Sequence, residues 1–282
     1  MYRTIDGWPA CAYSRDGGHT WTPPAYKTYA PGGRRVKHPR AANFAWNCGN
    51  GQFLYWFHNH GGRFIGELGA AGKGGRTPYD DRDPAWLMAG REVITPSGLR
   101  NEWSQPEILL YDDDPFIRMS YRDLVEDRGH FYVTETQKAV GRVHETPGAF
   151  LDGLFAQFNH QSIATNGLVL SLLAPVPAEA KLPSLPEFHQ RDTKSEDQRG
   201  KDLRAGFSID LWLKIITVVV NGVLCDGGDQ RQFGWGRFSP TLRAPNGEAK
   251  LKIAQAVQSL RLYQRALRTS EAVGNFRAGA RR

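Results

Sequence analysis

The stretch YSRDGGHTW, residues 13–21, most narrows what this chain can fold into. Its centre, Asp-Gly-Gly, supplies a side-chain acceptor and two residues that readily adopt positive φ, as a tight turn between two strands requires. Ser14 and Thr20 flank the turn, where their hydroxyl groups can hold it, and the large ring of Trp21 follows where it can fill a core. The stretch therefore predicts a β-hairpin.

Strand and turn signals recur along the first half of the chain. The motif W-T-x-P at residues 21–24 is echoed by W-S-x-P at 103–106, and the turn signals Asn-Gly at 50–51 and Arg-Gly at 128–129 each precede an extended stretch. The composition agrees, because 8 Trp, 31 Gly and 17 Pro favour short strands and tight turns over long helices. A period of roughly 40 to 45 residues is typical of β-propeller blades, and residues 1–172 hold about four blades' worth of strands.

The spacing S-x-D-x-G-x-T-W, from Ser14 to Trp21, resembles the Asp box of the sialidase-like (BNR/Asp-box) β-propellers. The resemblance implies a structural hairpin on the outer rim of a blade, away from the active centre. It makes residues 1–173 a portion of a sialidase-like propeller. Because sialidases close a ring of six blades and an open ring leaves unpaired edges, we expect further blades upstream of this sequence, or an unusual closure.

Residues 174–205 and 206–282 differ in character from the propeller portion. The first of these regions begins APVPAEAKLPSLPEF and continues with a strongly charged run, which predicts a linker. Three stretches of the second, GFSIDLWLK, ITVVVNGVLCDGG and LRLYQRALRTSEAVGNF, resemble strands and the closing helix of a laminin-G or concanavalin A-like jelly roll. Only Lys214 and Ile215 lie between two strands that several others separate in a complete jelly roll. The expected fold class is therefore all-β, with an incomplete sialidase-like propeller followed by a truncated concanavalin-like jelly roll.

The segment from Glu102 to Lys138 resembles a sialidase blade: W-S-x-P, an apolar strand, Y-x-D-L, a hairpin, and a strand that ends in Glu. The resemblance implies that Tyr121 is the catalytic nucleophile, with Asp123 in the same motif. It also implies that Glu135 is the carboxylate that orients an arginine of the substrate clamp. Without the resemblance, an ordinary strand tyrosine and a rim carboxylate are the alternatives.

The residue types of this segment suit an acidic sugar. A sialic-type sugar carries a carboxylate on its anomeric carbon, which repels a carboxylate nucleophile but not a phenol activated by a nearby base. Arginine suits the clamp because its planar fork grips a carboxylate through two parallel hydrogen bonds. The resemblance places Arg82 in this clamp, and Arg118 is a further candidate for substrate binding. A solvated loop arginine is the alternative for Arg82.

The preceding blade departs from the family pattern. The family has Asn-Glu at its start, with the Glu as base for the tyrosine, and Arg at the end of its strand. Here Arg40 stands near the expected Glu, and His58 and His60 stand near the expected Arg. Either the site serves a different acidic sugar, with His58 or His60 as base or cationic contact, or catalysis has been lost. The histidine pair also fits metal ligation or simple strand packing, and we expect no metal because no carboxylate partner is evident in the sequence.

The bulk properties exclude several function classes. The net charge of +7 suits acidic sugars, whereas nucleic acid is not expected because Lys and Arg are scattered and no basic run carries interleaved aromatics. The 3 cysteines are too few for a disulfide framework or a metal cluster. No stretch is long enough to cross a membrane, so no membrane insertion is expected. The start, MYRTIDGWPA, lacks the layout of a signal peptide, although the resemblance implies a secreted or periplasmic protein.

The expected function is hydrolysis of a terminal acidic sugar from a glycan through a tyrosine-linked intermediate, without a cofactor. The family's acid/base Asp and first clamp Arg lie on early blades that are not visible here, so this chain by itself is expected to be inactive. The alternative is a carbohydrate-binding or adhesive module without turnover. The sequence leaves the sugar, its linkage and the oligomeric state open.

Overall fold

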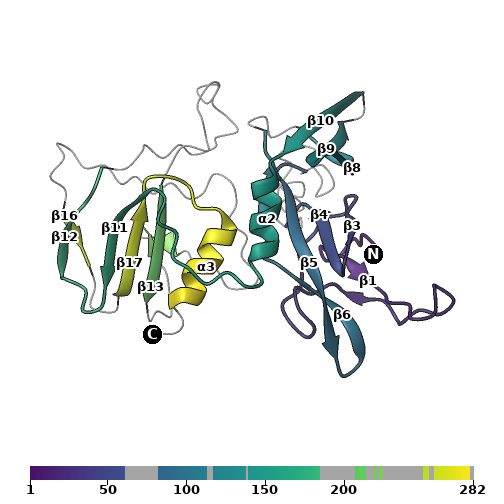
Figure 1. The fold of residues 1–282 in the computed structure, drawn as a ribbon, viewed down its shortest axis with the longest axis horizontal. Coiled ribbons are helices and arrows are strands. Elements are labelled where there is room, and N and C mark those ends of the chain that lie inside the picture. Colours follow the sequence, from purple (N-terminus) through teal and green to yellow (C-terminus); the bar gives the residue numbers. More distant parts are fainter. Residues whose placement is uncertain are drawn as a thin grey trace. The chain divides into compact units, whose positions relative to one another are not determined.

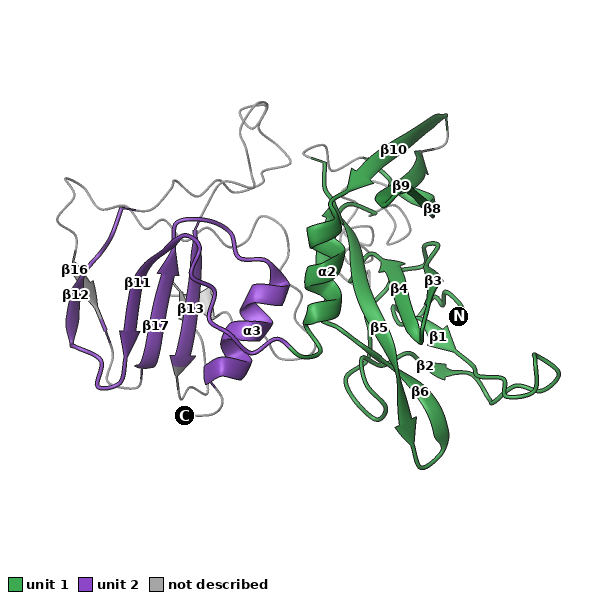
Figure 2. Cartoon of the chain, viewed as in Figure 1, with its two compact units in different colours: residues 1–159 green, residues 160–282 purple. Residues whose placement is uncertain are grey.

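The computed structural model describes residues 1–60, 82–112, 117–137, 139–184, 207–213, 219–220, 223–224, 250–253 and 257–279. These residues form mostly β-structure, in several antiparallel sheets, none of which closes into a ring within the described ranges (Figure 1). The chain divides into two compact units, residues 1–159 and 160–282 (Figure 2). The all-β class is confirmed at this level.

The largest sheet of unit 1 has five antiparallel strands. Their order is β3-β4-β5-β6, with β7 also pairing with β5. The strands are β3 (Phe44–Gly49), β4 (Gln52–Phe57), β5 (Ala85–Thr95), β6 (Gly98–Trp103) and β7 (Glu107–Leu110). The turn between β3 and β4 is at Asn50-Gly51, where both residues have positive φ, 50° and 71°. The turn signal at these positions is thereby confirmed.

A second sheet of unit 1 has three strands in the order β8-β9-β10. These are β8 (Ser120–Asp127), β9 (His130–Gln137) and β10 (Val140–Thr146). Arg128 and Gly129 form the turn between β8 and β9, with φ values of 53° and 83°. The second turn signal is therefore also confirmed.

The Asp-box stretch connects the short strands β1 (Ala10–Cys11) and β2 (Ala25–Tyr26), which pair antiparallel. Asp16 holds the turn, because its carboxylate accepts hydrogen bonds from the backbone N–H and the hydroxyl of Thr20, at 2.9 and 2.6 Å, and from the hydroxyl of Ser14 at 2.8 Å. These bonds, those from Thr20 foremost, lower the pKa of Asp16 to about 2.

The expectation that Trp21 fills a core is wrong. Its side chain is 60% exposed, and its indole N–H donates to the carbonyl of Gly18 at 2.9 Å. The ring therefore closes over its own turn instead of entering the sheet. A sequence pattern cannot separate these two placements, because both require a large ring directly after the turn.

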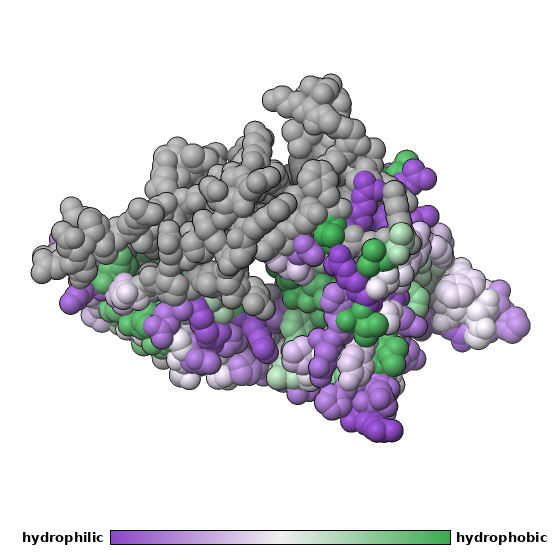
Figure 3. Space-filling model, turned by 90° about the horizontal axis from the view of Figure 1, so that it is seen from above, coloured by the Kyte–Doolittle hydropathy of each residue, from purple (hydrophilic) through white to green (hydrophobic). Residues whose placement is uncertain are grey.

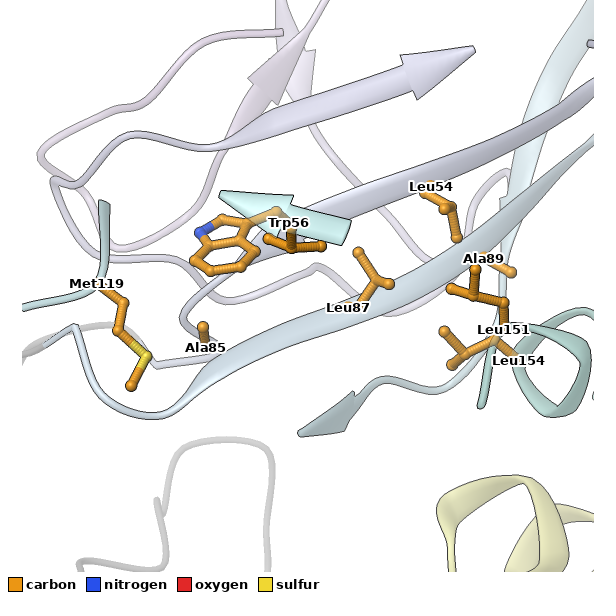
Figure 4. Close-up of a cluster of buried hydrophobic side chains, with 9 residues drawn as sticks. Leu54, Trp56, Ala85, Leu87, Ala89, Met119, Leu151 and Leu154 are labelled. Atoms are coloured by element: carbon orange, nitrogen blue, oxygen red, sulfur yellow. The ribbon is translucent and has the colours of Figure 1, made fainter. Parts of the chain in front are cut away.

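The core of unit 1 lies on both faces of the five-stranded sheet. Alternate residues of β4 face opposite sides, so Leu54 and Trp56 join one buried cluster while Tyr55 and Phe57 join another. Helix α2 (Gly148–Ala156) covers the first cluster, and Figure 4 shows its Leu151 and Leu154 beside Leu54 and Ala89 of the sheet. This helix differs from the expectation that residues 1–172 hold the strands of propeller blades.

Unit 2 contains a three-stranded sheet in the order β11-β17-β13. The strands are β11 (Leu168–Leu173), β13 (Ser208–Leu213) and β17 (Val257–Tyr263), and helix α3 (Thr269–Gly279) follows. Two further strand pairs are β12 (Glu179–Lys181) with β16 (Lys250–Lys252), and β14 (Val219–Val220) with β15 (Val223–Leu224). The strand and helix within 260–276 thus match the expected element types.

The unit boundary differs from the sequence-based one. Sequence analysis ended the first region at residue 173, whereas the two units meet at residues 159 and 160. The reason is long-range pairing, because β11 forms its ladder with β17, from Leu168 opposite Tyr263 to Leu173 opposite Ser259. Such a partner, about 90 residues downstream, gives no local signal in the sequence.

The remaining expectations on the fold are limited to the described ranges. Cys11 is half-buried and Cys48 is exposed, both as free thiols, while Cys225 lies outside the described residues. No helix among the described residues has the length and apolar character needed to cross a membrane. In the space-filling view, hydrophobic residues lie among hydrophilic ones on the described surface (Figure 3).

Replacing Leu154 by Ala tests the packing of α2 on the sheet. Leu154 is fully buried, so the change leaves a cavity and we expect it to lower the free energy of unfolding by about 2–5 kcal/mol. Urea unfolding followed by Trp fluorescence measures this, since six of the 8 Trp residues lie in residues 1–159. Ile94→Ala is the matched control, because Ile94 is 89% exposed and its loss should change stability by less than about 0.5 kcal/mol. Equal effects of the two changes would contradict the assignment of this core.

Candidate functional site

Tyr121 lies at an irregularity of β8. Ser120 pairs with Thr136 and Asp123 pairs with Thr134, so two residues, Tyr121 and Arg122, oppose the single residue between those partners on β9. This is a β-bulge, and Tyr121 has a φ of 47° and a side chain that is 65% exposed. Positive φ is rare for a bulky residue, and bulges often redirect side chains beside functional sites. The bulge is the first geometric feature that singles out the predicted nucleophile.

Glu135 is the residue opposite the bulge, and it is fully buried. Its Oε1 lies 3.4 Å from Nε2 of His144 and 3.6 Å from Nε of Arg142, both on β10. Arg142 in turn lies 3.4 Å from the carboxylate of Asp112. The other oxygen of Glu135, Oε2, has no hydrogen-bond partner among the described residues. Glu135 thus lies beside an arginine, and this arginine is Arg142, which the sequence did not single out.

Arg82 reaches the same part of unit 1. Its side chain is buried, and its guanidinium donates a hydrogen bond to the hydroxyl of Ser120, the residue before Tyr121. Its backbone forms an isolated parallel bridge with Arg118. The alternative of a solvated loop arginine therefore does not describe Arg82. The structure brings Arg82, Arg118 and Tyr121 to the beginning of β8.

Two buried histidines lie beside this region. Nδ1 of His38 accepts from the backbone N–H of His58 at 3.3 Å, and Nε2 of His38 donates to the carbonyl of Ala41 at 2.9 Å. The rings stack with centroids 5.8 Å apart. Burial, reinforced by nearby cationic groups, lowers the pKa of His38 to about 3 and that of His58 well below its ordinary value. Both rings are therefore neutral at pH 7, which favours packed strand histidines over a cationic contact at His58.

Arg40, His60 and Asp123 are the remaining candidates from the sequence. Arg40 is exposed and His60 is half-buried. Oδ1 of Asp123 accepts hydrogen bonds from the indole of Trp46 at 3.2 Å and from the backbone N–H of Leu124 at 2.9 Å. Asp123 thus has a local role in fixing β8. No group of three or more His, Cys, Asp or Glu side chains suited to a metal ion occurs in the described part of the chain.

Arg122, the second residue of the bulge, was also missed. It is only 7% exposed, and its guanidinium lies 5.5 Å from the ring of Phe44 and 5.6 Å from the ring of Trp56. Nη1 donates to the carbonyl of Ala42 at 3.1 Å. Loss of solvation lowers the pKa of Arg122 to about 9. Position x of the motif Y-x-D-L carries no sequence signal, so only the fold reveals this buried cation.

The region carries charges of both signs. In addition to burial, His60, Arg122 and Arg82 lower the pKa of His38, while the buried carboxylate of Glu135 lies opposite the bulge. The buried guanidinium groups of Arg82 and Arg122 can attract an anion.

A separate hollow lies near the Asp box. It has a volume of about 340 Å³ and is lined by residues of the turn and of β4 to β6, among them Tyr13, Phe53, Glu92 and Arg100. None of the residues predicted from the sequence to act on substrate lines it.

Acidification should destabilise unit 1 through the buried histidines. The folded state keeps His38 and His58 neutral, whereas the unfolded chain protonates them below about pH 6.5, so stability falls as the pH drops from about 6.5 to 4. Each of these histidines lowers the free energy of unfolding by up to about 1.4 kcal/mol for each pH unit of acidification. Urea midpoints across this range should fall less steeply in His38→Gln than in the wild type. The exposed His19→Gln is the control, and an unchanged slope in His38→Gln would refute the assignment.

Comparison with protein-family models, with curated proteins and with solved structures finds no significant match to this chain. The resemblance to the sialidase-like propellers therefore rests on the motifs of the sequence. The roles that it implies for Tyr121 and its neighbours are proposals.

Proposed function

We propose that unit 1 is part of a sialidase-like β-propeller glycoside hydrolase that removes a terminal acidic sugar from a glycan, with Tyr121 as the nucleophile. The observation that carries this proposal is the bulge at Tyr121. A non-glycine residue with positive φ costs about 1–3 kcal/mol and persists only where the surrounding structure imposes it. Here the strained residue exposes its phenol, while Ser120 before it accepts a hydrogen bond from the buried Arg82, and Arg122 after it is itself buried. We propose that a strained, exposed tyrosine at this position attacks an anionic sugar.

The proposed reaction proceeds by double displacement. The Oη atom of Tyr121 attacks the anomeric carbon while the glycosidic C–O bond breaks, the phenolic proton passes to a base, and the leaving oxygen takes a proton from an acid. Water then hydrolyses the aryl-glycosyl bond and restores the phenol. Arg82 and Arg118 hold the sugar carboxylate by charge-assisted hydrogen bonds. We propose that unit 2 is a truncated laminin-G-like jelly roll that docks on the substrate glycan. The proposed location of the protein is secreted or periplasmic.

A second candidate is a carbohydrate-binding module without turnover. Two observations favour it. No carboxylate among the described residues is hydrogen-bonded to the hydroxyl of Tyr121, and burial keeps His58 neutral and packed at neutral pH. A cationic site without a base still binds an acidic sugar.

Tyr121→Phe separates the two candidates. We expect the full-length gene product to release the aryl group from at least one aryl glycoside of a 2-keto acid sugar, and the variant to lose at least about a thousandfold in kcat, because it lacks the attacking oxygen. Affinity for the free sugar should change little. Tyr132→Phe, on β9, is the matched control and should keep its activity.

The outcomes distinguish the candidates. Binding of the free sugar without release from any substrate of the panel would favour the binding module. Full activity in Tyr121→Phe would exclude Tyr121 as nucleophile. If the protein shows no binding and no release, both candidates are overturned.

A further inference from the structure

The guanidinium of Arg122 has a free edge. Of its donors, Nη1 is bonded to the carbonyl of Ala42, while Nε and Nη2 are buried without a hydrogen-bond partner among the described residues. Nε and Nη2 lie side by side along one edge of the planar group. A buried donor without a partner costs about 1–3 kcal/mol, and more when it is charged. Native structures rarely keep two such donors on one group, so this edge requires an explanation.

No ion pair joins Arg122 to a carboxylate in the described part of the chain, although the buried Glu135 lies opposite the bulge. The carboxylate nearest in sequence, Asp123, accepts from Trp46 and Leu124, and no ion pair joins it to Arg122. The indole Nε1 of Trp56, whose ring lies 5.6 Å from the guanidinium, is also buried without a partner. The site therefore combines a cation with several unused donors, which is the composition of an anion site.

We infer that the Nε–Nη2 edge of Arg122 is the binding site for a ligand carboxylate. Two parallel N–H groups match the two oxygens of a planar carboxylate, which they grip in a bidentate manner. A carboxylate carries one negative charge, which the single charge of Arg122 balances, whereas phosphate at pH 7.5 carries up to two.

Phe44 lies against the guanidinium of Arg122, with its ring centroid 5.5 Å from the Cζ atom. Its side chain is 46% exposed and its ring packs against Trp46 with centroids 5.1 Å apart. Because Nε and Nη2 are buried, a ligand reaches them only when a neighbouring side chain moves.

The source of the carboxylate is either a small organic acid or an acidic sugar. In the second case Arg122 would join Arg82 and Arg118 in holding the sugar carboxylate; this identification rests on the proposed function. The carboxylate site itself does not, because it depends on the unused donors of Arg122 alone.

Thermal unfolding with added anions tests the inference. At pH 7.5 and constant ionic strength, acetate, pyruvate, glucuronate and N-acetylneuraminate are compared with chloride and phosphate. We expect at least one carboxylate to raise the Tm of the wild type in a saturable manner, because a ligand that binds only the folded state stabilises it. Arg122→Met should weaken this binding by at least about tenfold, the loss of one bidentate pair. Without ligand it should also melt above the wild type, because an unpaired buried charge is gone.

Two further variants complete the design. Arg122→Lys keeps the charge but lacks the fork, so it should lose the preference for carboxylate over chloride; it also serves if Arg122→Met does not fold. Arg100→Met is the matched control, since the Arg100 guanidinium lies 4.6 Å from the ring of Tyr13, and it should respond as the wild type does.

Each outcome bears on the site. A response to acetate and pyruvate identifies a small organic acid, and a response to the sugar acids alone identifies an acidic sugar. The inference is overturned by a wild type that responds to no carboxylate, by responses to phosphate or chloride equal to those to the carboxylates, or by an unchanged response in the Arg122 variants. Binding that persists in Tyr121→Phe shows that the site stands even where the proposed turnover fails.

Discussion

Burial of both faces of the β4–β5 strand pair is the constraint on which unit 1 depends. Leu54 and Trp56 pack on one side with α2, while Tyr55 and Phe57 pack on the other. At about 25 cal/mol per Å² of apolar surface removed from water, covering both faces of this pair contributes favourably to the stability of unit 1. The edge strands and the bulge of β8 are held in place by this centre. Local strain at Tyr121 is tolerated because the surrounding packing is strong.

The same burial produces the electrostatic character of the site. Cations next to aromatic rings lose solvation, which lowers the pKa of Lys27 to about 7 where its Nζ lies 3.5 Å from the Trp103 ring. Arg122 against Phe44 and Trp56 follows the same rule, but it stays protonated at neutral pH. Lys27 can relieve the cost by releasing its proton, whereas Arg122 requires an anion. This difference between the two side chains makes Arg122 the better indicator of a ligand.

The sequence predicts the local features well and the long-range ones poorly. The turns at 50–51 and 128–129 and the Asp16 turn follow from residues that lie within a few positions of one another. The pairing of β11 with β17 depends on residues far apart in the chain. Among site residues, the motif singled out Tyr121 and Glu135, whereas Arg122 and Arg142 become visible only through the register of β8, β9 and β10. Alternation along a strand is readable, but which strands are neighbours is not.

Three energetic costs occur at neighbouring positions of β8 and β9, where Tyr121 and Arg122 lie opposite Glu135. Tyr121 has positive φ, Arg122 keeps two unused donors, and Glu135 keeps an unpartnered oxygen, Oε2. A carboxylate bound at Arg122 offsets the second cost but not the third, because it would repel Glu135. The Oε2 atom requires a donor, and a hydroxyl group is the neutral donor that an acidic sugar carries beside its carboxylate. A polyhydroxy acid carries both a carboxylate for the unused donors of Arg122 and a hydroxyl group for Oε2 of Glu135. It therefore offsets two of these costs, whereas a simple carboxylate offsets only the one at Arg122.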